Sequence, residues 1–207
     1  MKIKILFNPN ANKLSYLFQY FYNPDFAVKK FYSSIIQITI DRAAVKRAWE
    51  FANKVIATVN YADSNQHQTK KILDDHFVSK LGEEACKMVL QQYAKVEGPD
   101  YAIYDAQQKS WSDDLMINDI GVAVKTQRRT NAVKYTLSWT FQCAQTRRDT
   151  ILDKPDAWIV FVEYDDTRPY NCYVYPPYQV KELKFSEPKL QYLKQSKKVV
   201  YAAELPC

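Results

Sequence analysis

The spacing of apolar residues changes along the chain, from a helical period in its first half to alternation in its second. A β-branched stretch at 33–40 indicates a strand, and apolar side chains then recur at helical spacing over 42–60 and over roughly 70–94. Asp41 is placed to cap the first of these helices, because its carboxylate can accept hydrogen bonds from the opening turn. The second helix is expected to end before the glycine and proline of EGPDY.

From residue 100 onward the pattern has a period of two, which is typical of strands. The expected strands cover residues 101–106, 110–117, 120–127, 133–142, 157–164 and 170–176. A short helix is expected over 141–152, and the strand over 157–164 is apolar enough to be buried on both faces. The pattern therefore predicts an α/β fold with a central mixed β-sheet flanked by helices, in one domain over residues 1–207.

Composition removes several classes of function. The 207 residues include only three glycines, so neither a phosphate-binding loop of the GxxxxGK[ST] type nor a GxGxxG turn can be built. A GxSxG nucleophile motif is also missing from the sequence. The four cysteines are widely spaced without a CxxC pair, which favours free thiols over a zinc site.

The start of the chain bears on where the protein resides. It lacks the long apolar segment and small-residue cleavage site of a signal peptide, and its most apolar run is too short to span a bilayer. We therefore expect a cytoplasmic protein without membrane contact.

The segment DLMINDIGVAVKTQ at 114–127 predicts a β-hairpin with a polar face. Asn118 and Asp119 tolerate the positive φ of a two-residue turn, which pairs Leu115 with Val122 and places Asp114 opposite Ala123. Alternation then puts Gly121, Ala123, Lys125 and Gln127 on one face, and Val122, Val124 and Thr126 on the other. Asp114 shares the first face and lies diagonal to Lys125, at roughly 7 to 8 Å.

An aspartate beside a lysine on one sheet face suits phosphodiester cleavage. A carboxylate can hold Mg²⁺, and the ion polarises a phosphate and lowers the pKa of water, while a lysine orients that water or offsets charge. One carboxylate is usually too few, so a second is expected nearby. On a helical wheel Glu84 lies at the edge of the apolar face, whereas Glu83 points nearly opposite it, so Glu84 is the expected partner.

The order of these segments carries a resemblance to a known family. A helix containing GEEA is followed by PDYAIY, KSWSDDLMI, VAVKTQ, LSWTFQ and AWIVFVEY, over roughly residues 70–180. The chain resembles the restriction-endonuclease-like nucleases, whose signature is an Asp followed by Glu/Asp-x-Lys. The resemblance implies that residues 70–180 form a nuclease core and that residues 1–69 add an N-terminal helical and strand segment.

The resemblance also implies roles for individual residues. Asp114 would be the metal-binding aspartate, Lys125 the catalytic lysine, Gln127 the glutamine that often follows it, and Glu84 the helix carboxylate of some members. The implied metal ligands are Asp114, Glu84 and Val124. Ala123 departs from the family pattern, because it stands where the family has Glu or Asp, and Glu84 or Asp100 would then supply the second carboxylate.

Positive charge is concentrated after the hairpin. The chain has a net charge of +6, and a group of basic residues is expected to contact nucleic acid phosphates, namely Arg128, Arg129, Lys134, Arg147 and Arg148. A solvated basic surface is the plainer interpretation of the same run.

These observations lead to one principal hypothesis with two alternatives. The first is an endodeoxyribonuclease of restriction type that uses Mg²⁺ or Mn²⁺, cuts double-stranded DNA and forms a homodimer, since two strands require two active sites. The second is a nuclease-like protein that binds DNA without cutting it. The third is a domain that binds a protein partner through its aromatic surface, because 16 tyrosines are many for this length.

Overall fold

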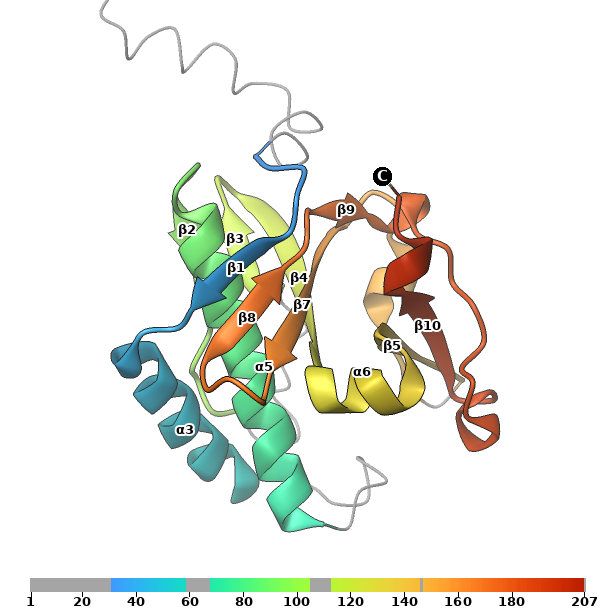
Figure 1. Ribbon diagram of the computed structural model, residues 1–207, viewed down its shortest axis with the longest axis horizontal. Helices are drawn as coiled ribbons and strands as arrows, with labels where there is room; N and C mark the ends of the chain where they lie inside the picture. Colours follow the sequence, from blue (N-terminus) through green and yellow to red (C-terminus); the bar gives the residue numbers. More distant parts are fainter. Residues whose placement is uncertain (1–30, 59–67, 105–112, 146, 207) are drawn as a thin grey trace, which may run out of the picture.

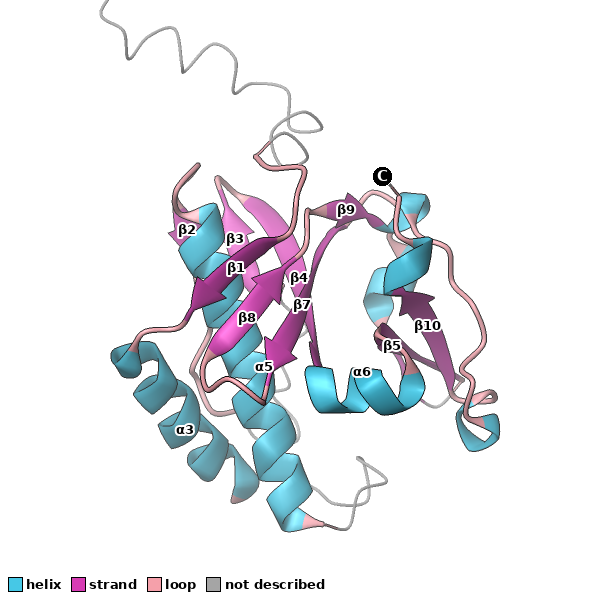
Figure 2. Ribbon diagram, in the orientation of Figure 1, coloured by secondary structure: helices cyan, strands magenta, loops and turns pink. Residues whose placement is uncertain are grey.

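Two β-sheets and two long helices make up most of the protein, as the ribbon diagrams show (Figures 1 and 2). The structure is a computed structural model that describes residues 31–58, 68–104, 113–145 and 147–206. The helices are α3 (Arg42–Ile56), α5 (Thr69–Leu90) and the short α6 (Arg129–Tyr135). Short 3₁₀ turns occur at Thr150–Asp153, Val180–Glu182, Gln191–Leu193 and Ala202–Glu204.

The larger sheet is mixed and places β4 and β7 at its centre. Its order is β1 (Ile36–Thr39), β8 (Asn171–Val174), β7 (Trp158–Asp165), β4 (Ile120–Arg128), β3 (Leu115–Ile117) and β2 (Val96–Glu97), and β9 (Tyr178–Gln179) pairs with the start of β7. Strands β4 and β7 run parallel, whereas the other neighbours run antiparallel. The parallel pair needs a crossover, and the segment that contains α6 and two strands of the smaller sheet supplies it.

The smaller sheet contains three strands within the described ranges. Its order is β10 (Lys197–Tyr201), β5 (Ser138–Ala144) and β6 (Arg147–Arg148), all antiparallel. It packs against β4 and β7 from the side opposite α5, through an aromatic cluster in which Trp139 stacks on Phe161 at 4.5 Å. The central strands therefore lie between two hydrophobic layers.

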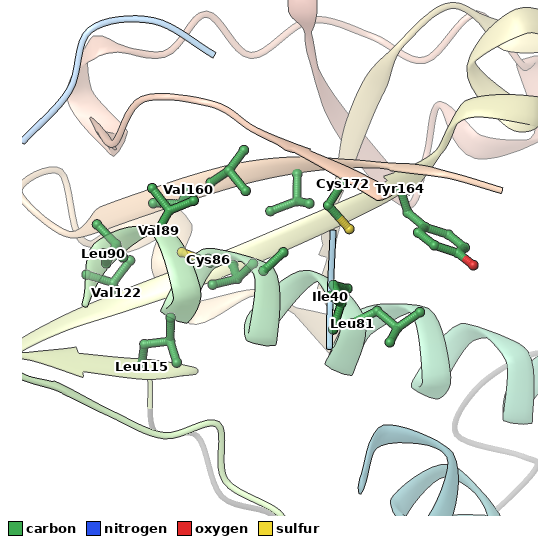
Figure 3. Close-up of a cluster of buried hydrophobic side chains, with 14 of the residues drawn as sticks. Ile40, Leu81, Cys86, Val89, Leu90, Leu115, Val122, Val160, Tyr164 and Cys172 are labelled. Carbon is green, nitrogen blue, oxygen red and sulfur yellow. The ribbon is translucent and has the colours of Figure 1, made fainter. Parts of the chain in front are cut away.

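The main hydrophobic core lies between helix α5 and the larger sheet (Figure 3). Leu81 and Val89 of α5 pack there against Val122 and Val160 of the central strands. Every residue of β7 is buried, which explains the uninterrupted apolar run at its start, Trp158–Val162. At about 25 cal/mol per Å² of apolar surface, each of these side chains contributes roughly 1.5 to 3 kcal/mol when buried.

Several expected elements are confirmed. The cap of α3 forms as predicted, since Oδ1 of Asp41 accepts from the Ala44 amide at 2.8 Å. Helix α5 also forms as predicted, but it ends at Leu90 and not near residue 94. A turn follows it before β2 begins at Val96. The strands over 120–127 and 157–164 are β4 and β7, and the strand expected over 170–176 is β8, which pairs with β7.

Other expected elements are wrong. Residues 101–104 form no strand, while 105, 106 and the segment 110–112 lie outside the described residues. The helix expected over 141–152 is instead the end of β5, then β6 and a 3₁₀ turn. Cys86, Cys143 and Cys172 are free thiols as expected, and Cys207 lies outside the described residues.

Tertiary contacts explain why residues 133–135 are helical and not extended. Arg129, at the start of α6, forms ion pairs with Glu163 and Asp165 of β7, each at 2.8 Å. The amide of Thr130 donates to Oδ1 of Asp166 at 3.1 Å, which satisfies one orphan N–H group of the first turn. These contacts outweigh the local strand pattern, and β5 starts only at Ser138.

Candidate functional site

The hairpin has the predicted register. Asn118 and Asp119 adopt φ of 46° and 69°, as a two-residue turn of the primed type requires. Leu115 pairs with Val122, Met116 with Gly121 and Ile117 with Ile120. This register determines which side chains of β4 share a face.

The two faces of β4 are also as predicted. Val122 and Val124 pack in the core beneath α5, and Thr126 lies against Gly82 of that helix. On the other face, Ala123 packs on the aromatic cluster, and Nζ of Lys125 lies 5.2 Å from the centre of the Phe141 ring. The alternation places Lys125 away from α5.

Asp114 occupies the point where β3 begins and β4 continues beyond it. Its Oδ2 accepts a hydrogen bond of 2.7 Å from the Val124 amide, so the carboxylate substitutes for a strand at this edge of β4. Burial raises the pKa of Asp114, and the Val124 amide, Lys80 of α5 and Lys125 of β4 lower it only in part. Charged groups on both faces of β4 therefore act on Asp114.

The helix carboxylate on which the charge of Asp114 acts is Glu83, whereas the helical wheel indicated Glu84. Both glutamates are buried, each with 3% of its surface exposed. Oε1 of Glu84 accepts from Arg47 of α3 at 2.8 and 3.1 Å and from the hydroxyl of Tyr101 at 2.8 Å. Glu84 therefore holds α3, α5 and the following loop together.

Glu83 has weaker compensation for its charge. Lys80, one turn earlier in α5, donates to its Oε2 at 2.6 Å, and Ser79 donates to its Oε1 at 3.3 Å. Nζ of Lys80 also lies over the rings of Phe51 and Tyr101, at 4.9 and 5.6 Å. These aromatic faces stabilise the ammonium group in a largely buried place.

Sequence reasoning missed Glu83 and Lys80 because α5 is not a surface helix. Its residues 81–86 are all buried, since α3 covers one side and the sheet another. A wheel that assigns one buried face fails for such a helix. The three-residue spacing of Lys80 and Glu83 was the available signal, because it allows an ion pair on one helix face.

The electrostatics of this site disfavour two ionised carboxylates. Burial and then the charge of Asp114 raise the pKa of Glu83, Lys80 and Ser79 lower it only in part, and the pKa that results is about 8. Burial also raises the pKa of Asp114, against the Val124 amide, Lys80 and Lys125, and Asp113 adds to the increase. An additional cation would therefore lower both pKa values and stabilise the pair.

The other expected site residues are engaged elsewhere. Nζ of Lys125 donates to Oδ2 of Asp149 at 2.9 Å, so it balances that carboxylate in this structure. Nε2 of Gln127 donates to the Ser138 carbonyl at 3.2 Å and its Oε1 accepts from the Arg128 amide, which links β4 to β5. Val124 contributes only its backbone, because its side chain is apolar.

Asp100 is an unsuitable second carboxylate in this arrangement. It is exposed, and it accepts hydrogen bonds from the Tyr104 hydroxyl and the Ala102 amide of its own loop. Tyr104 lowers the pKa of Asp100, which is the opposite of the shift at Glu83.

Most of the expected DNA-contacting basic residues have acidic partners. Arg128 pairs with Asp74 at 2.6 Å, Arg129 with Glu163 and Asp165, and Arg148 with Asp153 at 2.7 Å. The ammonium group of Lys134 lies 5.0 Å from the centre of the Tyr135 ring on exposed α6. The run of positive charge in the sequence is therefore largely neutralised within the fold.

Among the residues that the structure describes, no helix is long and apolar enough to cross a membrane, and no three His, Cys, Asp or Glu side chains gather as a metal-binding group. Comparisons of the chain with protein-family models, with curated proteins and with solved structures give no match.

Proposed function

We propose that the protein is a Mg²⁺-dependent endodeoxyribonuclease of the restriction type, with Asp114 and Glu83 as its metal-binding carboxylates. The observation that carries the proposal is the position of Asp114. It is held by the Val124 amide where β3 and β4 separate, and its charge acts on the buried Glu83 of α5. The segments of the resemblance also follow one another as helix, hairpin and buried parallel strand, in the order α5, β3, β4 and β7.

The residues fit the requirements of Mg²⁺. This ion is commonly held by one or two carboxylates, with water and substrate phosphate completing its shell, so a third acidic side chain is unnecessary. The raised pKa values of Asp114 and Glu83 support the assignment, because Lys80 alone leaves the pair short of positive charge. Glu83 thus takes the place that Ala123 leaves without a carboxylate.

Each side chain then has a definite task in hydrolysis. When bound, Mg²⁺ supplies charge neutralisation at the phosphate and a lowered pKa of its water. Asp114 and Glu83 would hold the ion, and the ion together with Lys80 would favour the ionised form of Glu83. Lys125 would bring positive charge to the same edge of β4 if its ammonium group contacts both Asp149 and the phosphate. Water adds to phosphorus, the bond to the leaving sugar oxygen breaks, and that oxygen takes up a proton.

Cleavage of mixed-sequence plasmid and phage DNA tests the proposal. Wild-type protein should produce fragments with Mg²⁺ or Mn²⁺ and none with EDTA. Asp114→Asn and Glu83→Gln should abolish cleavage, whereas Asp100→Asn should leave it intact because Asp100 binds its own loop. Equal cleavage by Asp114→Asn and the wild type would refute the site. Cleavage of both strands further requires two copies, so we expect a homodimer on the DNA.

The departure at Ala123 keeps one alternative in view, a nuclease-like protein that only binds DNA. DNA that shifts on a gel and stays intact with every divalent ion would establish it. In that case Asp114→Asn should leave the gel shift unchanged.

A further inference from the structure

A basic and aromatic surface lies where α6 ends and the chain approaches β10. Nζ of Lys134, in the last turn of α6, lies 5.0 Å from the centre of the Tyr135 ring. Lys189 is far from this helix in sequence, but its Nζ donates a hydrogen bond to Oγ1 of Thr136, the C-cap residue of α6. The segment that leads into β10 therefore lies beside the end of α6 (Figure 1).

Tyr192 adds an exposed ring to this surface. It lies three residues after Lys189, in the 3₁₀ turn Gln191–Leu193, and 76% of its surface is exposed. Tyr135 raises the pKa of Lys134 and Tyr192 adds to this increase, which agrees with a position of Tyr192 near that lysine. Within the described ranges, no other aromatic ring packs on Tyr192. We name Lys134, Lys189 and Tyr192 the α6 patch.

The two lysines of the α6 patch carry positive charge that no carboxylate compensates among the residues that the structure describes. Lys134 and Lys189 contact only uncharged side chains there, two tyrosine rings and a threonine hydroxyl. Glu187 lies in the same segment, but it pairs with Lys194 at 3.2 Å, so these two charges cancel. The α6 patch should therefore attract an anionic partner.

Single-stranded DNA matches both the charge and the exposed ring. Its phosphates can pair with the lysines, and one of its bases can stack on Tyr192. The bases of a duplex are already stacked on one another, so a ring at the protein surface contacts only a base that has left the stack. A protein or lipid partner should instead also use the apolar Val133 of α6, which is 85% exposed.

The α6 patch can also be reached by a strand that passes the carboxylate pair. Strand β4 continues from Val124, whose amide holds Asp114, to Arg128, and α6 follows directly. At about 3.3 Å per strand residue and about 1.5 Å per helical residue, Lys134 lies about 25 Å or less from Asp114. About seven nucleotides span this distance at about 3.4 Å each.

We propose that the α6 patch binds a single-stranded stretch of DNA, with a base stacked on Tyr192 and backbone phosphates at Lys134 and Lys189. This inference rests on the proposed function, and it gives the substrate a single-stranded segment next to the bond that is cut. The three side chains are then binding residues and not catalytic ones.

Two labelled oligonucleotides test the stacked base. Fluorescence anisotropy in EDTA compares a mixed-sequence single strand with an abasic strand of the same length, which keeps the phosphates and lacks the bases. Tyr192→Ser should weaken binding of the complete strand about 10-fold and leave binding of the abasic strand unchanged, because only the complete strand can stack. Tyr192→Phe keeps the ring and should bind both strands like the wild type.

A lysine on another helix is the matched control for the phosphate contacts. Lys134→Gln should reduce the slope of log affinity against log salt by about 0.7, the value for one phosphate of a single strand. Lys46→Gln should leave the slope unchanged, because Lys46 is equally exposed on α3 but lies 3.8 Å from Glu50. Val133→Ser should leave binding of both strands unchanged.

The outcomes separate this inference from the nuclease proposal. The α6 patch would be overturned if the wild type binds neither strand, if Tyr192→Ser binds the complete strand like the wild type, or if Lys46→Gln loses as much slope as Lys134→Gln. Binding to vesicles of phosphatidylglycerol and phosphatidylcholine that Val133→Ser weakens, without binding of the single strand, would also overturn it. Cleavage with Mg²⁺ alongside any of these results would leave the nuclease standing without the patch. The expected pattern without cleavage would leave the patch on a protein that only binds DNA.

Discussion

Two pairs of carboxylates, one on β7 and one formed by Glu83 of α5 and Asp114 before β3, differ in what compensates their charge. On β7, Glu163 and Asp165 share Arg129, with ion pairs of 2.8 Å each, and the amide of Thr167 also donates to Asp165. Burial alone would raise the pKa of Asp165, but the hydrogen bonds of Thr167 and the charges of Arg129 and Arg168 outweigh it and lower the pKa. The positive charge of Arg129 thus compensates both carboxylates of β7, and we call Glu163 and Asp165 the complete pair.

The pair of Glu83 and Asp114 shows the opposite balance. Its nearest cation is Lys80, and the pKa values of both carboxyl groups are raised. The difference indicates that burial by itself does not mark a functional carboxylate. A buried carboxylate pair that lacks sufficient positive charge is the one that gains by binding a cation.

Removal of the Arg129 cation from the complete pair should have the largest effect on the unfolding free energy. Arg129→Ala should lower the unfolding free energy by about 3 kcal/mol, because two carboxylates remain buried without their partner. Urea denaturation at neutral pH measures this loss. Arg148→Ala is the control, since its ion pair with Asp153 is exposed to solvent and contributes much less to stability. Equal losses in both variants would contradict the comparison.

The pair of Glu83 and Asp114, whose charge is compensated only in part, should give the unfolding free energy an unusual dependence on pH. The pKa of Glu83 is about 8 in the folded protein against 4.5 for the unperturbed group, so the folded state binds this proton more tightly. Its contribution to stability is therefore full below pH 4.5 and is lost as the pH rises toward 8. With EDTA present, the wild type should lose about 1 to 3 kcal/mol over this range.

Replacement of Glu83 isolates that contribution. Glu83→Gln should flatten the dependence of the unfolding free energy on pH, because the amide does not titrate. Glu97→Gln is the control, since Glu97 is exposed and pairs with Lys95 at the surface. A pH dependence that persists in Glu83→Gln would show that another group causes it.

A smaller effect is expected from the contact that brings α5 to β4. A Cβ atom at Gly82 would lie 1.8 Å from Oγ1 of Thr126, so the helix must retreat in Gly82→Ala. Overpacking costs about 1 to 3 kcal/mol, and the better helix propensity of alanine offsets up to about 1 kcal/mol. Thermal unfolding should show a net loss of about 1 kcal/mol. In addition, Glu83 should move away from Asp114, and its pKa should fall.

The elements that the sequence predicted correctly are those set by local chemistry. Asp41 caps α3, Asn118 and Asp119 form the turn, and the register of β3 on β4 follows from that turn. The strand pattern of residues 133–142 does not predict α6 correctly, because the ion pairs of Arg129 determine where this helix forms, and their partners are distant in sequence. Helical position likewise favoured Glu84, since the sequence does not reveal that α3 covers that side of α5.

Binding of Mn²⁺ measured by electron paramagnetic resonance tests the central claim most directly, because it reports the ion at Asp114 and Glu83 without DNA. The wild type should bind Mn²⁺, Asp114→Asn and Glu83→Gln should each lose that binding, and Asp100→Asn should retain it. Binding that is the same in the wild type and in Asp114→Asn, or its absence in a folded wild type, would contradict the account of this carboxylate pair as a metal site.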